Sequence, residues 1–182
     1  MAFIKTEIEG VVIFEPQVFG DERGYFFESY NSAVFALGGV DAKFVQDNQS
    51  SSKYGVIRGL HFQTGEYAQA KLVRALSGVI LDVAVDIRKG SSTYGKHVCV
   101  ELSSENKRQL FVPRGLAHGF SVLSAEAVVM YKCDNVYNKA SEGGILYNDK
   151  TLNINWGIPE GKEIISSKDL LLKDFNEYSQ GI

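Results

Sequence analysis

Two short segments carry the histidines that could move a proton. One runs from Gly55 to Gln63 (Gly-Val-Ile-Arg-Gly-Leu-His-Phe-Gln) and holds His61, and the other runs from Pro113 to Phe120 and holds His118. An unperturbed pKa of about 6.5 suits a histidine to proton transfer near neutral pH. A lone histidine is more often a core residue bonded to the backbone. The two segments together favour a catalytic site.

The spacing of the histidines disfavours a metal site. Metal-binding β-barrels usually offer two closely spaced histidines and a third ligand. Here Phe62 and Gln63 follow His61, and the last of the three histidines, His97, lies on a different predicted strand. The Gly-Gly pairs are explained as turns, and the sequence contains no Gly-x-Ser-x-Gly nucleophile motif.

Other polar residues could recognise a ligand that carries phosphate. Arg23 and Glu28 lie in an acidic, basic and aromatic segment that could equally be a surface turn. The amides of the segment 46–52 could read hydrogen-bonding edges, or simply form an exposed edge strand. Alternation places Arg58 and His61 on opposite faces of one strand. A bulge at the intervening Gly59 would bring both to one site.

Composition indicates one globular domain spanning residues 1–182. The chain is 45% hydrophobic and 23% charged, with a formal net charge of −3. No basic cluster exceeds two adjacent residues, which argues against nucleic acid as a partner. The N-terminus lacks signal-peptide features and no apolar run is long enough for a bilayer. Cys99 and Cys133 are expected to be buried free thiols in a reducing cytoplasm.

Period-two patterning with frequent turn signals predicts an all-β fold. The expected strands are Glu7–Pro16, Tyr25–Tyr30, Phe44–Ser51, Val56–Gln63, Lys71–Leu76, Val79–Ile87, His97–Leu102, Gln109–Val112, Gly119–Leu123 and Ala127–Cys133. A short helix is expected over Asn31–Leu37, with Asn31 as its cap, and a C-terminal helix over Ser167–Phe175. So many short strands in one domain predict a sandwich or a barrel, and a small barrel can hold one ligand in its mouth.

One turn allows a more detailed prediction. Ser77-Gly78 suits a two-residue hairpin turn between strands 71–76 and 79–87. That register places Lys71 and Asp82 on one face as diagonal neighbours. The face either meets solvent or lines a polar cavity, and periodicity alone favours solvent.

With these residues in view, the sequence resembles the dTDP-4-dehydrorhamnose 3,5-epimerase family, whose members are metal-independent, cupin-like (jelly-roll) β-barrel enzymes. The resemblance covers nearly the whole chain, and its order and spacing are specific. The departures are minor: Lys139 and Lys150 stand where the family tends to have proline, and Tyr147 where it tends to have tryptophan. The matching segments are Phe19–Glu28, Gln46–Asn48, Ile57–Gln63, Gln69–Arg74, Asp82–Arg88, Gly115–Phe120, Tyr131–Cys133 and Asn148–Asp149.

The resemblance implies the catalytic roles. His61 resembles the general base and Asp169 the carboxylate that orients it. Lys71 resembles the cation beside the C4 carbonyl oxygen, and Tyr131 the acid that reprotonates the opposite face. These roles suit a 4-keto sugar, because hydrogens α to a carbonyl are weakly acidic and inversion needs a base, an acid and a charge that holds the enolate. No metal and no cofactor are implied.

The resemblance also implies the residues that bind substrate and a partner. The substrate is a dTDP-sugar, and the enzyme is a homodimer whose N-terminal strands reach the neighbour's site. The implied binding residues are Arg23, Glu28, Gln46, Asp47, Asn48, Arg58, His118, Glu142 and Lys168.

Three alternatives remain open at this stage. A C3-only epimerase, or a ketoisomerase on a related nucleotide sugar, would share the barrel and much of the binding set. An inert sugar-nucleotide-binding barrel is disfavoured because all four implied catalytic residues are present. A metal-dependent cupin oxygenase is disfavoured by the missing His-x-His motif.

Overall fold

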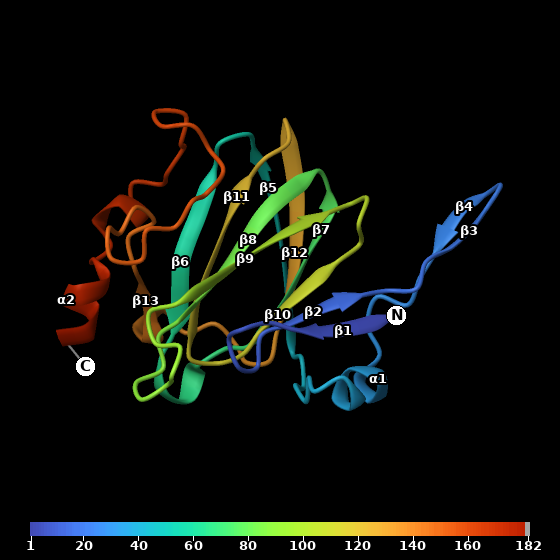
Figure 1. The fold of residues 1–182 in the computed structure, drawn as a ribbon, viewed down its shortest axis with the longest axis horizontal. Helices are drawn as coiled ribbons and strands as arrows, with labels where there is room; N and C mark the ends of the chain where they lie inside the picture. Colours follow the sequence, from blue (N-terminus) through green and yellow to red (C-terminus); the bar gives the residue numbers. More distant parts are fainter. Residues whose placement is uncertain (181–182) are drawn as a thin grey trace.

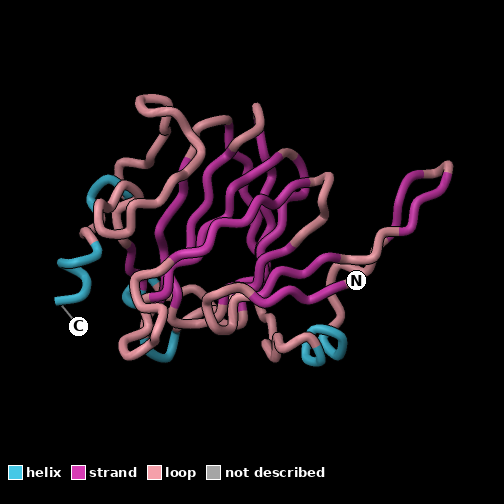
Figure 2. The backbone as a smooth tube through the Cα atoms, viewed as in Figure 1, coloured by secondary structure: helices cyan, strands magenta, loops and turns pink. Residues whose placement is uncertain are grey.

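The computed structural model describes residues 1–180 and consists mainly of two β-sheets packed face to face (Figures 1 and 2). The sheets have the strand orders β1-β2-β10-β7-β12-β5 and β13-β6-β11-β8-β9, and every paired strand runs antiparallel to its neighbour. The strands are β1 (Ala2–Lys5), β2 (Val12–Glu15), β3 (Phe19–Asp21), β4 (Gly24–Phe26), β5 (Gln46–Lys53), β6 (Ile57–Gln63), β7 (Lys71–Ser77), β8 (Val79–Asp86), β9 (His97–Ser103), β10 (Gln109–Val112), β11 (Leu116–Val122), β12 (Glu126–Cys133) and β13 (Glu142–Gly144).

Helical structure is scarce, as the sequence predicts. The helices are α1 (Ser32–Leu37) and α2 (Phe175–Gln180), with 3-10 turns η1 (Gly65–Tyr67), η2 (Lys139–Ser141) and η3 (Asp169–Leu171). Over the described residues, no helix is long and apolar enough to cross a membrane. The all-β, jelly-roll-type barrel is confirmed.

The inner faces of the two sheets form the main core. Val73 and Ala75 of β7 pack there with Ile80 and Ala84 of β8. The outer face of the five-stranded sheet is also covered. Val83 of β8 packs there in a second apolar cluster with side chains from the C-terminal part of the chain. In Figure 1 the segment that ends in α2 lies beside β6, on that outer face. The five-stranded sheet therefore carries an apolar cluster on each of its two faces.

The predicted hairpin at Ser77-Gly78 is wrong. Strand β7 pairs with β10 and β12, whereas β8 pairs with β9 and β11, so the turn carries the chain from one sheet to the other. Gly78 has φ +74°, and a Cβ at this position would meet the carbonyl oxygen of Glu126. The face with Lys71 and Asp82 points into the barrel, not to solvent. Alternation alone identifies the face but not what covers it.

Several strand boundaries near the N-terminus also differ from the prediction. The expected strand 7–16 contains a turn, so that only Val12–Glu15 is extended there, and strands β1, β3 and β13 were not predicted. β1 is nevertheless paired along its length with β2. These short strands gain their order from pairing with neighbours, which local patterning does not reveal.

One helix prediction is confirmed and the other is wrong. Asn31 caps α1, since its Oδ1 accepts hydrogen bonds from the N–H groups of Ala33 and Val34. The expected helix 167–175 is a single 3-10 turn, and α2 begins only at Phe175. Two carboxylates hold that start: Oδ2 of Asp149 accepts the N–H of Phe175 at 2.8 Å, and Oδ1 of Asp174 accepts the N–H of Glu177 at 2.8 Å.

Both cysteines are free thiols, but only Cys133 is buried. Cys99 is exposed, contrary to the prediction. It lies on β9, at the edge of the five-stranded sheet, where alternate side chains face outward.

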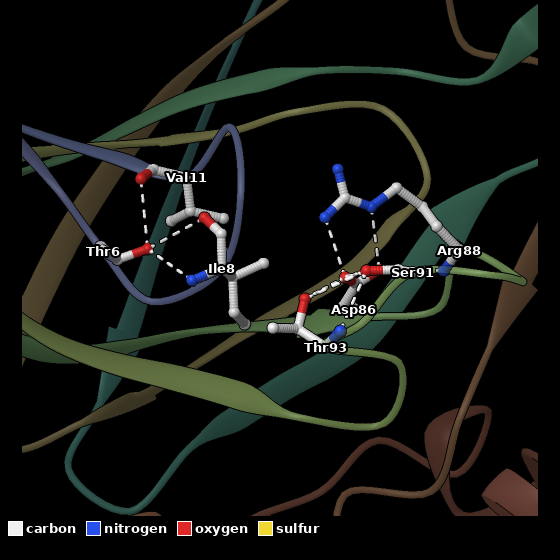
Figure 3. Close-up of polar contacts among 7 residues, drawn as sticks. All are labelled: Thr6, Ile8, Val11, Asp86, Arg88, Ser91 and Thr93. Atoms are coloured by element: carbon white, nitrogen blue, oxygen red, sulfur yellow. Dashed lines mark hydrogen bonds and ion pairs between the residues drawn. The ribbon is translucent and has the colours of Figure 1, made fainter.

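A buried carboxylate organises the loop that follows β8 (Figure 3). Asp86 is fully buried and accepts hydrogen bonds from Arg88, Ser91 and Thr93. The connection between β8 and β9 is thereby tied to the end of β8.

Candidate active site

Two adjoining cavities share three side chains that come from both sheets. One cavity of about 420 Å³ and another of about 390 Å³ are both lined by His61, Lys71 and Tyr131. His61 lies on β6 of the five-stranded sheet, whereas Lys71 and Tyr131 lie on β7 and β12 of the six-stranded sheet. Asp169 lines the first cavity as well. The structure therefore brings all four predicted catalytic residues together.

Arg58 and His61 reach the same cavity because β6 is irregular at Gly59. In the pairing with β11, His118 lies opposite His61 and Phe120 lies opposite Arg58, so one strand carries an extra residue between these pairs. Gly59 has φ +125°, and a Cβ there would lie 2.6 Å from the backbone of β11. Glycine alone fits such a position. The predicted bulge is confirmed.

A buried carboxylate orients His61. Nε2 of His61 lies 2.9 Å from Oδ1 of Asp169, which begins η3 and is 4% exposed. The other oxygen, Oδ2, accepts the N–H of Gly59 at 3.4 Å. Burial lowers the pKa of His61, and the hydrogen bond and charge of Asp169 oppose that effect. The imidazole is therefore neutral near neutral pH and can accept a proton.

Lys71 and Tyr131 lie close together on neighbouring strands of the other sheet. Nζ of Lys71 is 5.8 Å from the centre of the Tyr131 ring. Burial lowers the pKa of Lys71 and raises the pKa of Tyr131. The phenol therefore keeps its proton at neutral pH and can act as a donor. The lysine supplies a positive charge in a poorly solvated place, where charge acts strongly on a ligand.

His118 lines the first cavity and is bonded to a second buried carboxylate. Its Nε2 lies 2.8 Å from Oδ1 of Asp82 on β8. His118 is 6% exposed and Asp82 is fully buried. The site thus contains two histidines, each held by its own aspartate.

The predicted binding residues on β5 separate by strand alternation. Gln46 and Asn48 line the second cavity, and Asn48 lies opposite Tyr131 in the sheet. Asp47 points to the other face, where its carboxylate accepts hydrogen bonds from Nζ of Lys132 at 3.0 and 3.2 Å. Within this chain the structure does not bring Asp47 to the cavities.

Glu142 and Lys168 form a polar rim at the second cavity. Glu142 lines that cavity, and its Oε2 accepts hydrogen bonds from Nζ of Lys168 at 2.8 Å and from Oη of Tyr137 at 3.1 Å. These bonds lower the pKa of the carboxyl, the lysine bond most strongly. Lys168 immediately precedes Asp169 in the chain, so the rim adjoins the carboxylate that holds His61.

Arg23 and Glu28 are not brought to the cavities of their own chain. Arg23 lies in the turn of the β3–β4 hairpin, which extends away from the barrel in Figure 1, and its guanidinium pairs with Asp21. Glu28 accepts a hydrogen bond from Nδ2 of Asn31 at 3.2 Å. The hairpin exposes three large side chains, Phe19, Tyr25 and Phe26.

Some residues that shape the cavities lie outside the predicted set of site residues. Phe120 and Ile165 form apolar wall, and Tyr137 lines the second cavity. Phe120 belongs to the second histidine segment and lies two residues after His118, on the same face of the strand, which was a usable signal. Ile165 lies in a loop without a motif, next to Ile164, whose backbone bonds to Gly55 and Ile57.

The donor set of the site offers little to a metal. Among the described residues, no three or more His, Cys, Asp or Glu side chains are placed so that they could share one ion. What the arrangement can do is proton transfer: a neutral base from one sheet, and a protonated phenol with an ammonium group from the other.

Comparison with known proteins shows which family this chain is similar to. The model of dTDP-4-dehydrorhamnose 3,5-epimerase matches residues 5–177. The enzyme of that name from Shigella flexneri is 57% identical over 171 residues, covering 93% of each chain. The crystal structure of dTDP-4-dehydrorhamnose 3,5-epimerase from Elizabethkingia anophelis superposes with a TM-score of 0.93, at 55% identity and 97% coverage of both chains.

A second solved structure contains a ligand. The dTDP-6-deoxy-D-glucose-3,5-epimerase of Legionella pneumophila, in complex with dTDP-4-keto-L-rhamnose, has a TM-score of 0.91 and 48% identity. The match covers 96% of this chain and 92% of that one.

Proposed function

Because the chain belongs to the dTDP-4-dehydrorhamnose 3,5-epimerase family, its reaction is the inversion of C3 and C5 in dTDP-4-dehydro-6-deoxy-D-glucose, and we propose that His61, Lys71 and Tyr131 carry it out. The product is dTDP-4-dehydro-L-rhamnose. The substrate is a small nucleotide-linked sugar, in agreement with the ligand of the related Legionella enzyme.

The first step is removal of a proton next to the keto group. His61 takes the hydrogen from the carbon α to C4, and the electron pair moves into the carbonyl to give an enolate. The aspartate that bonds its Nε2 fixes the imidazole's orientation and supports the positive charge that His61 then carries. The ammonium of Lys71 stabilises the negative charge that develops on the C4 oxygen.

Inversion follows when the proton returns from the other face. Tyr131 comes from the sheet opposite His61, so its hydroxyl can donate a proton to the face that the base does not meet. The phenolate that results is reprotonated before the next cycle. The same pair acts at C3 and at C5, since both carbons adjoin C4.

One observation carries these assignments: a base on one sheet and an acid with a cation on the other line the same cavities. The test is incubation with dTDP-4-keto-6-deoxyglucose in D₂O, with deuterium followed by NMR. We expect deuterium at both C3 and C5, with both centres inverted. Deuterium at C3 alone would indicate a C3-only epimerase, and no exchange at either carbon would contradict proton abstraction.

The nucleotide part of the substrate is expected to contact the remaining polar residues of the cavities. Arg58 offers a planar, charged donor suited to phosphate oxygens. Its Nε donates to Oγ of Ser52 at 3.0 Å, so the guanidinium is already oriented along the first cavity. Further contacts are proposed for Gln46, Asp47, Asn48, His118, Glu142 and Lys168, with Asp47 requiring a change from its ion pair with Lys132.

We also propose that the protein is a homodimer with exchanged N-terminal strands. The β3–β4 hairpin carries the predicted ligand residue Arg23 but extends from its own barrel with Phe19 and Phe26 more than half exposed, at 57% and 70%. Such apolar exposure suits an interface. Arg23 and the nearby Glu28 would then serve the partner's site.

Mixed dimers test this exchange. Arg23→Ala and His61→Asn chains are co-expressed and assayed at limiting substrate. If Arg23 serves the partner's site, mixed dimers contain one site with both residues intact, in roughly a quarter of all sites for random pairing. Activity no higher than the average of the two separate variants would contradict the exchange, and a monomer in solution would contradict the dimer.

We expect the activity to need no metal, since Lys71 supplies the positive charge at the carbonyl. Exhaustive chelation should leave the rate unchanged, and a large loss restored by added metal would contradict this. A cytoplasmic location is proposed because the chain's cysteines are free.

A further inference from the structure

Asp82 is the one described residue with a buried side-chain polar atom that lacks a hydrogen-bond partner. Its side chain is fully buried, and its Oδ1 accepts from His118 at 2.8 Å. The other oxygen, Oδ2, has no partner. Leaving a buried charged oxygen unpaired is costly, so such atoms are rare in folded proteins and call for an explanation.

Lys71 is a second polar group without a direct partner. Among the described residues its ammonium makes no hydrogen bond or ion pair, and it lies 5.8 Å from the centre of the Tyr131 ring. Asp82 on β8 and Lys71 on β7 point into the barrel from opposite sheets and interact through their charges. An anion and a cation are thus held facing the same interior without neutralising each other in a close pair.

The charge of Asp82 matters because Lys71 is poorly solvated. Burial lowers the pKa of Lys71, and Cys133, Asp82 and Glu142 oppose this, in that order. Burial also raises the pKa of Cys133 to about 11, so its thiol is uncharged near neutral pH. Glu142 lies on the rim and is already paired with Lys168. Among the groups that raise the Lys71 pKa, Asp82 is the fully buried carboxylate, and it has no lysine or arginine as a partner.

We propose that Asp82 is a positioning residue for the half of the site that binds the C4 oxygen: one oxygen orients His118, and the carboxylate's charge keeps Lys71 charged and free to meet the substrate. Asp82 does not line either cavity and so does not act on the substrate directly. Because Oδ2 of Asp82 makes no hydrogen bond or ion pair with Lys71, the ammonium remains available to the enolate. On this view Asp169 positions the base His61, whereas Asp82 positions Lys71 and His118, the groups on the side of the C4 oxygen.

The inference rests on the role proposed for Lys71, and it predicts a pH effect. The alkaline limb of kcat/KM should report loss of the Lys71 proton, because the Tyr131 pKa is raised by burial. Replacing Asp82 by a neutral residue should lower the Lys71 pKa and move this limb to lower pH. The other titratable or charged groups around Lys71 and Asp82 are Arg58 and His61 on β6, Cys99 on β9, His118 on β11, Tyr131 and Cys133 on β12, Glu142 on β13 and Asp169 on η3.

The experiment compares two aspartates on one strand. The Lys71 pKa is measured by NMR of protein labelled with ¹³C-lysine, in the original chain, in Asp82→Asn and in Asp86→Asn, with Lys71→Arg for assignment. Asp86 is equally buried but bonds only to the β8–β9 loop. We expect Asp82→Asn to lower the Lys71 pKa and the alkaline limb together, by on the order of one unit, as for loss of a nearby charge. Asp86→Asn should move neither.

The Lys71 pKa and the position of the alkaline limb test different parts of the proposal. An unchanged Lys71 pKa in Asp82→Asn overturns the inference whatever happens to the rate. A lowered pKa with an unmoved limb contradicts the role proposed for Lys71, and with it the catalytic part of this inference. If Asp82→Asn does not fold, His118→Ala keeps the charge of Asp82 while removing the hydrogen bond from His118, and should lower the rate without moving the limb. A shifted limb in that variant would assign the effect to His118 instead.

Discussion

Asp82 and Asp86 lie four positions apart on the same face of β8, and both are fully buried, yet their surroundings differ completely. Every oxygen of Asp86 is occupied: Oδ1 accepts from the backbone and Nε of Arg88, and Oδ2 accepts from Arg88, Ser91 and Thr93 (Figure 3). Asp82 has one bonded oxygen and one without a partner.

The difference indicates that the buried charge of Asp86 stabilises the structure, whereas the buried charge of Asp82 serves function. Burial alone would raise the pKa of Asp86, but the hydrogen bonds from Arg88, Ser91 and Thr93 outweigh it and hold the pKa well below its usual range. That carboxylate is more stable in the folded chain than in water, and it fixes a loop. Asp82 keeps one oxygen without a partner, and the nearby Lys71, which lines both cavities, has no hydrogen bond or ion pair among the described residues, as expected beside a functional site. Changes near Asp82 should therefore affect rate, and changes at Asp86 should affect stability.

The largest expected effect is at the base. His61→Asn keeps some hydrogen bonding but cannot accept the proton, so kcat should fall by about 10² to 10⁴-fold, the usual contribution of general base catalysis. Calorimetric dTDP binding and the thermal midpoint should stay close to those of the original protein. Exchange of the C3 and C5 hydrogens in D₂O at the normal rate would show that His61 is only structural.

Tyr131→Phe sharpens the comparison by separating the two faces of the sugar. His61 can still remove the proton and Lys71 can still hold the enolate, but the far face lacks a donor. The enolate should recapture a proton from His61, so the variant should exchange deuterium with slow or absent inversion. NMR of the sugar measures both. Equal loss of exchange and inversion would mean that Tyr131 assists deprotonation, and full inversion would assign the acid to Tyr137 or water.

What the sequence could predict follows from how local each feature is. The strand pattern, the Asn31 cap and the bulge at Gly59 depend on neighbouring residues, and the structure confirms them. The pairing of β7 and β8 with other strands depends on contacts far along the chain, so the hairpin prediction was wrong.

The site shows the same limit. Lys71 and Tyr131 lie in patterned strands, but nothing in their local sequence shows that they face His61 across the barrel. The position of Asp169 beside His61 involves residues 108 apart, and only resemblance to the family pointed to it. The unpaired oxygen of Asp82 is a property of packing, which no sequence pattern encodes.

A smaller effect is expected for binding. Arg58 lines the first cavity, whereas Arg88 is engaged with Asp86 at 2.8 Å. Loss of a charge-assisted hydrogen bond costs roughly 1.5–3 kcal/mol, so Arg58→Ala should weaken dTDP binding by about 10 to 150-fold in calorimetry. Arg88→Ala serves as the control and should leave the affinity unchanged. Equal affinities for Arg58→Ala and the original chain would remove Arg58 from the ligand site.

The smallest effect on catalysis is expected at Asp86, the second aspartate of the comparison. Asp86→Asn removes the charge that Arg88, Ser91 and Thr93 surround, and should lower the free energy of unfolding by about 1–3 kcal/mol at pH 7. Because the folded-state pKa of Asp86 lies below its unfolded value of about 3.9, this contribution is complete above that pH and declines as pH falls further. Urea unfolding at pH 7 and at acid pH should therefore show a difference between the two chains that narrows in acid, while kcat of the folded variant is unchanged. A difference that stays constant with pH would mean that Asp86 stabilises the fold through packing and not through its charge. A large fall in kcat would mean that Asp86 also contributes to catalysis, against the division of roles between Asp82 and Asp86.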